Sequence, residues 1–350
     1  MRKAKMMIML IIGLVYNSFG QQYVPFPIAN ANWNVIYAGT CQDVRPDGTH
    51  ATTVTIGNIV TVINPDGTHS VGTVQTAVEA SQSRISGKNA HMDSLYFVWE
   101  SDTLYQKPES AVYDSHDGII YVSNINGKYL ARDGNGFISR LSCDGKTETL
   151  KWIDGLNNPQ GLGIYKRKLF VADINRVVRI DLDKACVDKV WEIPEAVFLN
   201  DISTDNNGDV YVSECRLNKI YRIHRDEVKL WLSDSLLSSP NGLLCSYPQL
   251  MLLNMKDGKV FRINKRTGHL TEFSNGIKNA DGITGDGSDG YFVSGAWQGE
   301  VFHIDGRGTK RLLLDLGKNK KIAADICYIP SKRMLIIPTL QKTVMAFQYK

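Results

Sequence analysis

The feature that most constrains this chain is a repeat of about 40 residues that recurs six times in its carboxyl-terminal part. Each copy reads as strand, turn, strand, and most copies continue into a third and a fourth alternating apolar run. The copies begin at Pro108, Pro159, Leu199, Pro240, Ala280 and Ala324. No helical period runs through them. Four short antiparallel strands per repeat are typical of a propeller blade, so six repeats predict a six-bladed β-propeller.

The last repeat ends after three strands, so closing the ring requires a strand from elsewhere in the chain. A blade left short would present an unpaired edge. The segment 95–100, upstream of the first repeat, resembles the fourth strands, and its Trp99 occupies the column of Trp152 and Trp231. We therefore expect this segment to complete the last blade. The predicted fold class is all-β, a six-bladed β-propeller of four-stranded antiparallel blades over residues 95–350.

Two parts of the chain precede the propeller. Within residues 1–20, three basic residues are followed by a short apolar run and small residues up to Gly20. This order is typical of a signal peptide cleaved near Gly20, whereas a membrane anchor would need about 20 apolar residues. We expect an extracytoplasmic protein, periplasmic or secreted, with no membrane insertion after cleavage. Residues 21–94 lack the repeat and predict a small β-rich appendage of unknown role, with a hairpin at 54–63.

Composition excludes several classes of protein. The chain has 350 residues, of which 43% are hydrophobic and 22% charged, values close to globular averages. The formal net charge of +4 comes from basic residues spread along the chain, which argues against a nucleic-acid partner. Six cysteines lie far apart without metal-binding spacing, and no disulfide is predicted. Because a closed ring needs no further strand pairing, we expect a monomer.

One column of the repeat brings polar residues to the axis of the propeller. The innermost strands of all blades start at the same level around the central channel, so residues in one repeat column converge there. The column consists of Glu109, Gln160, Asn200, Asn241, Asp281 and Ala324. Buried carboxylates and amides are unfavourable unless something satisfies them. Either these side chains bond to neighbouring loops, or they bind a cation.

A single divalent cation would match this column. Glu109 and Asp281 supply two negative charges, and Asn200 and Asn241 add carbonyl oxygens. Ca²⁺ takes about six to eight oxygen ligands and is therefore the first expectation. Mg²⁺, Mn²⁺ or Zn²⁺ could substitute, although the column has no His or Cys of the kind that Zn²⁺ prefers. Positions left for water or substrate favour a catalytic role over a purely structural one.

The residues around the column resemble a known family. PESAVYD, LNDISTD, SPNGLL and NADGIT are similar to blade motifs of the senescence-marker-protein/gluconolactonase family, six-bladed propellers related to diisopropylfluorophosphatase and paraoxonase. The resemblance covers residues 95–350. It implies one channel metal held by Glu109, Asn241 and Asp281, with Asn200 facing the metal or the substrate. It also implies a hydrolase, with Asp281 as base or nucleophile and Asn200 as a second catalytic residue.

The resemblance has a departure, and the function has alternatives. Phe198 stands where gluconolactonases similar to the vertebrate enzyme carry an Arg that binds the sugar acid. Residues expected in the substrate pocket are Gln160, Phe198, Asn200, Trp297 and Arg132, the last on an insertion at 126–137 that we interpret as part of a lid. The first hypothesis is a lactonase or esterase acting on a small molecule. The second is a non-catalytic propeller that binds a protein or glycan and keeps a structural metal.

Overall fold

The computed structural model describes residues 23–25, 38–44, 50–56, 59–63, 69–73 and 94–350. The chain divides into two compact units, Met1–Met92 and Asp93–Lys350. The predicted signal peptide at 1–20 lies outside the described residues. Within the described ranges, no helix has the length and apolar character needed to cross a membrane.

The first unit contains a five-stranded antiparallel sheet in the order β1-β2-β3-β4-β5. Its strands are β1 (Tyr23–Pro25), β2 (Ala38–Val44), β3 (His50–Ile56), β4 (Ile59–Ile63) and β5 (His69–Thr73). β3 and β4 pair with Ile56 opposite Ile59, over the segment predicted as a hairpin. Its turn at 57–58 is not described. The extent and the role of the predicted appendage at 21–94 therefore stay predictions.

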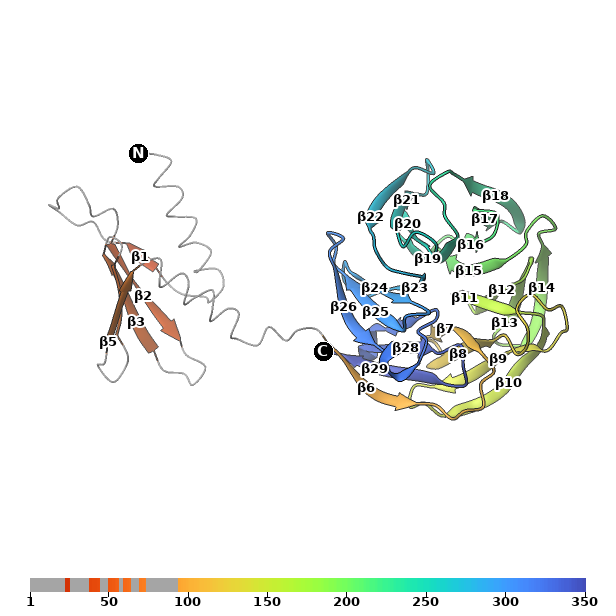
Figure 1. Cartoon of the computed structure of the whole chain (residues 1–350), viewed down its shortest axis with the longest axis horizontal. Coiled ribbons are helices and arrows are strands. Elements are labelled where there is room, and N and C mark those ends of the chain that lie inside the picture. Colours follow the sequence, from red (N-terminus) through yellow and green to blue (C-terminus); the bar gives the residue numbers. More distant parts are fainter. Residues whose placement is uncertain (1–22, 26–37, 45–49, 57–58, 64–68, 74–93) are drawn as a thin grey trace. The chain divides into compact units, whose positions relative to one another are not determined.

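The second unit consists of six four-stranded antiparallel sheets around a central axis (Figure 1). The first blade comprises β7 (Pro108–Asp114), β8 (Ile119–Asn124), β9 (Gly136–Ser142) and β10 (Thr147–Leu156). The second comprises β11 (Pro159–Tyr165), β12 (Lys168–Asp173), β13 (Arg176–Asp181) and β14 (Cys186–Glu192). The third comprises β15 (Leu199–Thr204), β16 (Val210–Glu214), β17 (Lys219–His224) and β18 (Glu227–Ser233).

The remaining blades repeat this plan. The fourth comprises β19 (Pro240–Ser246), β20 (Gln249–Asn254), β21 (Val260–Asn264) and β22 (Leu270–Ser274). The fifth comprises β23 (Ala280–Gly285), β24 (Tyr291–Gly295), β25 (Glu300–Ile304) and β26 (Lys310–Asp315). The sixth comprises β27 (Cys327–Ile329), β28 (Met334–Pro338), β29 (Val344–Tyr349) and β6 (Leu95–Glu100). The predicted six-bladed β-propeller is confirmed.

Strand β6 closes the ring in the way that the repeat predicts. It pairs antiparallel with β29, so a strand from before the first blade becomes the outer strand of the last one. Trp99 of β6 lies opposite Ala346, and its indole Nε1 donates a hydrogen bond of 2.9 Å to the carbonyl oxygen of Cys143 in the first blade. The closing strand therefore joins the first and last blades.

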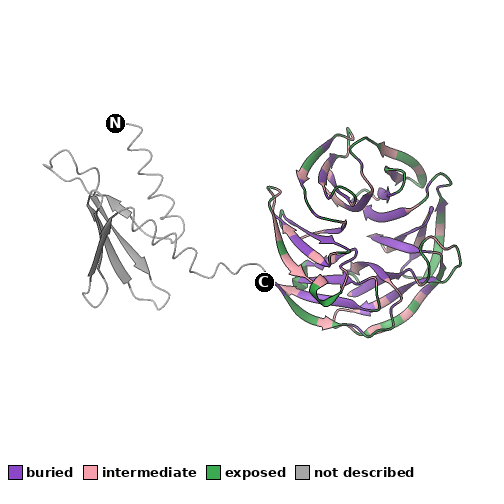
Figure 2. Cartoon of the chain, viewed as in Figure 1, coloured by how far each residue is buried: buried purple, intermediate pink, exposed green. Residues whose placement is uncertain are grey.

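Apolar side chains fill the space between neighbouring blades. Figure 2 shows the inner strands as almost wholly buried and the outer strands as partly exposed. The tryptophans of three outer strands pack on aromatic rings of their own blades: Tyr121 with Trp152, Phe170 with Trp191, and Tyr211 with Trp231. These tryptophans contribute to blade packing, as their repeated position in the sequence indicates.

Glycines let the innermost strands approach one another at the axis. A Cβ atom on Gly242 of β19 would lie 2.2 Å from the carbonyl oxygen of Asp281 on β23. A Cβ atom on Gly161 of β11 would lie 2.5 Å from the Cα atom of Asp201 on β15. Side chains larger than hydrogen cannot fit at such distances. The glycines therefore bring the polar residues of neighbouring blades close together around the channel.

Candidate functional site

The residues of the predicted column lie at the starts of the innermost strands. Glu109, Gln160, Asn200, Asn241 and Asp281 are each the second residue of β7, β11, β15, β19 and β23, and Ala324 precedes β27. All six are buried. The column therefore forms one level of the central channel, with polar side chains from five of the six blades.

Asn241 and Asp281 make a direct contact between the fourth and fifth blades. The amide nitrogen Nδ2 of Asn241 donates to Oδ1 of Asp281 at 2.6 Å. The same nitrogen lies 3.9 Å from the sulfur of Met255. Because both amide hydrogens are used, the carbonyl oxygen of Asn241 is the atom left to bind a ligand.

Glu109 is a buried carboxyl group with an unsatisfied oxygen. The residue is 3% exposed, and in the part of the chain that the structure describes Oε2 has no hydrogen-bond partner. Burial, reinforced by the charges of Asp281, Asp325 and Asp201, raises the pKa of Glu109 well above its ordinary value. An oxygen in this state is unfavourable in a folded protein unless it is protonated or binds a cation.

Two further acids, Asp201 and Asp325, belong to the same cluster and are not among the site residues expected from the sequence. Asp201 accepts hydrogen bonds of 2.6 Å from the backbone nitrogens of Ile202 and Leu243. Asp325 accepts one from the hydroxyl of Ser110, and its backbone nitrogen donates to the carbonyl oxygen of Glu109 at 3.0 Å. The signal that could have identified them is the next repeat column, which reads Ser110, Gly161, Asp201, Gly242, Gly282 and Asp325.

The four carboxyl groups form an acidic centre that protein side chains do not neutralise. We define the acidic centre as Glu109, Asp201, Asp281 and Asp325. In the described part of the chain, no Lys, Arg or His forms a salt bridge with any of them. Burial is the largest cause that raises the pKa of Asp281 and that of Asp325, each to about 7. At low pH these carboxyl groups are therefore protonated. At high pH they are ionised, and a bound cation would stabilise them.

The donor set at the column suits a metal only if amide oxygens take part. Across residues 94–350, no group of three or more His, Cys, Asp or Glu side chains is arranged so that it could hold a metal ion by itself. Glu109, Asn241 and Asp281 combine two carboxylates with one amide, a purely oxygen set of the kind that Ca²⁺ accepts. The unpaired Oε2 of Glu109 is the observation in this structure that fits such an ion.

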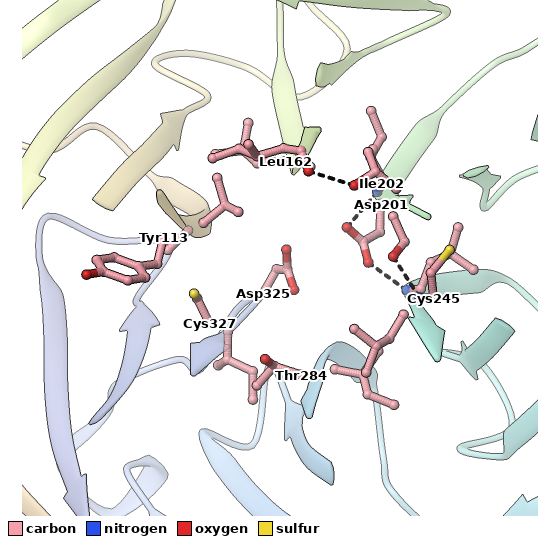
Figure 3. Close-up of a pocket in the computed structure, with 18 of the residues that line it drawn as sticks. Tyr113, Leu162, Asp201, Ile202, Cys245, Thr284, Asp325 and Cys327 are labelled. Atoms are coloured by element: carbon pink, nitrogen blue, oxygen red, sulfur yellow. Dashed lines mark hydrogen bonds between the residues drawn. The ribbon is translucent and has the colours of Figure 1, made fainter. Parts of the chain in front are cut away.

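A cavity of about 380 Å³ lies further along the same strands. Figure 3 shows Asp201 and Asp325 beside it, with walls from Tyr113, Leu162, Ile202, Cys245, Thr284 and Cys327. Each of these wall residues follows the column residue of its own strand in the sequence. The cavity therefore occupies the half of the channel beyond the column, and none of the predicted substrate-pocket residues lines it.

The predicted substrate-pocket residues have different surroundings. Gln160 is buried, and its Nε2 donates to Oδ1 of Asn158 at 3.1 Å. Phe198 is half-buried and Asn200 is buried. Trp297 and Arg132 are exposed, and no hydrogen bond or ion pair links either of them to a column residue among the described residues. The structure therefore places Gln160 and Asn200 in the column. That Phe198, Trp297 and Arg132 contact a substrate stays a prediction.

Comparison with known proteins finds similarity in structure. No family model matches the sequence, and no curated protein matches it significantly. A gluconolactonase from Xanthomonas campestris superposes with a TM-score of 0.59 at 14% identity, covering 73% of this chain and 89% of that one. A catalytically inactive virginiamycin B lyase from Staphylococcus aureus, solved with quinupristin, superposes with a TM-score of 0.54 at 15% identity, covering 94% and 99%.

These structural similarities concern the fold. At identities of 14% and 15%, the arrangement of the chain is what the proteins share. A gluconolactonase is among the structural neighbours, so the resemblance that the sequence motifs indicate is matched at the level of the propeller. Residue roles in this chain must be argued from its own site.

Proposed function

We propose that this chain is a divalent-metal-dependent hydrolase that acts on a small lactone or ester at the central channel. The observation that carries the proposal is the buried Oε2 of Glu109, which has no partner among the described residues and lies in an acidic centre to which they contribute no salt bridge. Unrelated propellers bind many kinds of ligand, so the residues of this site decide its function. The similarity in fold to a gluconolactonase structure also supports a hydrolase.

Glu109, Asn241 and Asp281 would hold the cation. Two carboxylates balance the charge of one divalent ion, and the free carbonyl oxygen of Asn241 supplies a neutral ligand. Ca²⁺ fits this oxygen set best, and Mg²⁺, Mn²⁺ or Zn²⁺ are the alternatives to test. When bound, such a cation acts as a Lewis acid toward a carbonyl oxygen.

Asp281 and Asn200 are the residues that we assign to the chemistry. The Oδ1 atom of Asp281 is fixed by Asn241, which leaves Oδ2 to accept a proton from water or to attack the carbonyl carbon. Asn200 is buried at the start of β15, at the same level of the channel, and its amide can orient the substrate carbonyl.

We also propose that the protein acts outside the cytoplasm as a soluble monomer after cleavage near Gly20. The support is the basic and apolar order of residues 1–20 in the sequence. Cell fractionation combined with mass determination of the mature amino terminus tests this assignment. A full-length chain retained in the cytoplasm would contradict it.

Activity assays test the hydrolase. The purified protein is treated with chelator and assayed on aliphatic lactones, sugar lactones and phenyl esters, before and after adding each of the four cations. We expect turnover that depends on metal and that falls at least about 100-fold in Asp281→Asn. Asp289→Asn is the matched control, because Asp289 is exposed and lies outside the acidic centre.

The outcomes separate the two hypotheses for this site. Metal-dependent turnover that is lost in Asp281→Asn and kept in Asp289→Asn supports the hydrolase. Metal binding without turnover of any compound favours the non-catalytic propeller with a structural metal. Turnover that survives both chelation and Asp281→Asn would overturn the assignment of the site.

A further inference from the structure

Six residues occupy equivalent positions in the repeat, two residues before the column. They are Lys107, Asn158, Phe198, Ser239, Asn279 and Ile322. Three of them share a left-handed backbone, with φ of 53° at Lys107, 56° at Ser239 and 50° at Asn279. Three of the six positions therefore have the same backbone conformation just before the column. Lys107 is the charged residue of the six.

The ammonium group of Lys107 is held in place by uncharged partners. Its Nζ donates a hydrogen bond to the carbonyl oxygen of Gly127 and lies 5.5 Å from the centroid of the Tyr129 ring. The side chain is half-buried. No carboxylate forms an ion pair with Lys107 within the structure described for the propeller. Its position is thus fixed without its charge being neutralised.

The insertion that carries Gly127 and Tyr129 is linked to the column by hydrogen bonds through Asn158. Oδ1 of Asn158 accepts hydrogen bonds from the backbone nitrogen of Leu130 at 3.3 Å and from Nε2 of Gln160 at 3.1 Å. Gln160 is the column residue of the second blade, and Asn158 is fully buried. The predicted lid therefore has a fixed attachment beside the column, and the amide of Gln160 contributes to that attachment.

The same insertion lies near the proposed metal ligands. Leu130 of the insertion and Gln160 of the column both donate to Oδ1 of Asn158, so the insertion lies beside the column. In keeping with this, burial and the charges of Glu109 and Asp281 raise the pKa of Tyr129. The ammonium group of Lys107 lies against the ring of Tyr129, which belongs to this insertion. Lys107 also precedes Glu109 by only two residues. Among the described residues, Lys107 is thus a cation without an ion-pair partner, next to the start of the strand that carries Glu109.

We propose that Lys107 is a specificity-determining residue that binds a carboxylate group of the substrate. The inference rests on the proposed function and names its substrate class as lactones or esters that carry a carboxylate. A ligand anion would be repelled by the acidic centre unless a nearby cation compensates. Lys107 offers that compensation at low cost, since its side chain is already ordered and partly desolvated.

A binding measurement separates this inference from catalysis. Succinate and the neutral compound 1,4-butanediol are titrated into the Ca²⁺-loaded full chain by calorimetry. We expect wild type to bind succinate, Lys107→Met to bind it about tenfold more weakly, and Lys107→Arg to retain binding. Lys229→Met is the matched control, because it removes one exposed charge from the outer strand β18. Succinate binding should weaken as salt is added.

Kinetics provide the second readout. With γ-butyrolactone and its ring-carboxylated analogue, Lys107→Met should raise KM for the carboxylated compound about tenfold and leave KM for the neutral one and both kcat values unchanged. Equal succinate affinity in wild type and Lys107→Met, or no succinate binding by wild type, would overturn the inference. Failure of the hydrolase proposal appears differently, as absence of turnover for both lactones.

Discussion

Asn241 and Asp281 come from neighbouring blades and are joined by a hydrogen bond of 2.6 Å between Nδ2 and Oδ1. The bond fixes one carboxylate oxygen and leaves the amide carbonyl and the second carboxylate oxygen for other partners. Glu109, from the first blade, belongs with Asp281 to the acidic centre, and its Oε2 atom has no partner among the described residues. Three blades thus supply oxygen atoms to one region of the channel.

The charge of Asp281 should control metal affinity. Asp281→Asn keeps the size of the side chain and removes the negative charge, so Ca²⁺ affinity should fall at least about 100-fold. Calorimetric titration of the chelator-treated variant measures this loss. Asp289→Asn should bind Ca²⁺ as wild type does, and a similar loss in that variant would point to a general charge effect.

The stability of the metal-free protein should decrease as pH rises. The pKa values of Asp281 and Asp325 are raised to about 7, whereas unfolded carboxyls titrate near 4. Between about pH 4 and pH 7 the native state therefore holds protons that the unfolded chain has lost, and the free energy of unfolding falls with pH. Urea unfolding in chelator across this range measures the slope.

Two controls identify the source of that slope. The double variant Asp281→Asn/Asp325→Asn cannot titrate at these positions, so the slope should become shallower. The slope that remains is expected from Glu109 and Asp201, because burial raises their pKa values as well. Saturating Ca²⁺ should raise the stability of wild type most at high pH, where the carboxyls are ionised. A wild-type stability that is flat or rising from pH 4 to pH 7 would show that the acidic centre does not hold these protons.

The close approach of β19 and β23 should depend on Gly242. In Gly242→Ala, the new methyl group would lie 2.2 Å from the carbonyl oxygen of Asp281, so the strands must separate. We expect a loss of about 1–3 kcal/mol of stability and weaker metal binding. Gly285→Ala is the control on β23, because a Cβ there meets nothing within 4 Å. Thermal unfolding compares the two, and equal effects would contradict the role of Gly242.

The ring closure should depend on Trp99. Trp99→Ala removes the hydrogen bond to Cys143 and the packing between the last and first blades, and we expect a loss of about 3 kcal/mol. Trp297→Ala serves as the comparison, since Trp297 is 52% exposed and should change stability by no more than about 0.5 kcal/mol. Urea unfolding of both variants decides whether Trp99 stabilises the closed ring.

Features that the repeat encodes could be predicted from the sequence. The blade strands, the closing strand at Leu95–Glu100 and the burial of the column all follow from residues that recur at one position in several repeats. Asp201 and Asp325 belong to the adjacent column, where glycines in three other blades hide the pattern. Their participation depends on how closely the inner strands pack, which the repeat alone does not specify.

Features that depend on a single blade could not be predicted in the same way. The hydrogen bonds that join Gln160, Asn158 and Leu130 require the insertion of the first blade to fold against the second. The contact between Lys107 and Tyr129 arises from the same insertion. Such contacts have no counterpart in the other repeats, so neither spacing nor composition reveals them.

The most direct test of the account is a calorimetric titration of Ca²⁺ into chelator-treated wild type and Glu109→Gln. Glu109→Gln keeps the shape of the side chain and replaces the unpartnered carboxylate by a neutral amide. We predict one Ca²⁺ per chain for wild type and at least about 100-fold weaker binding for the variant. Absence of Ca²⁺ binding by wild type, or equal affinity in the variant, would contradict a channel metal held by Glu109.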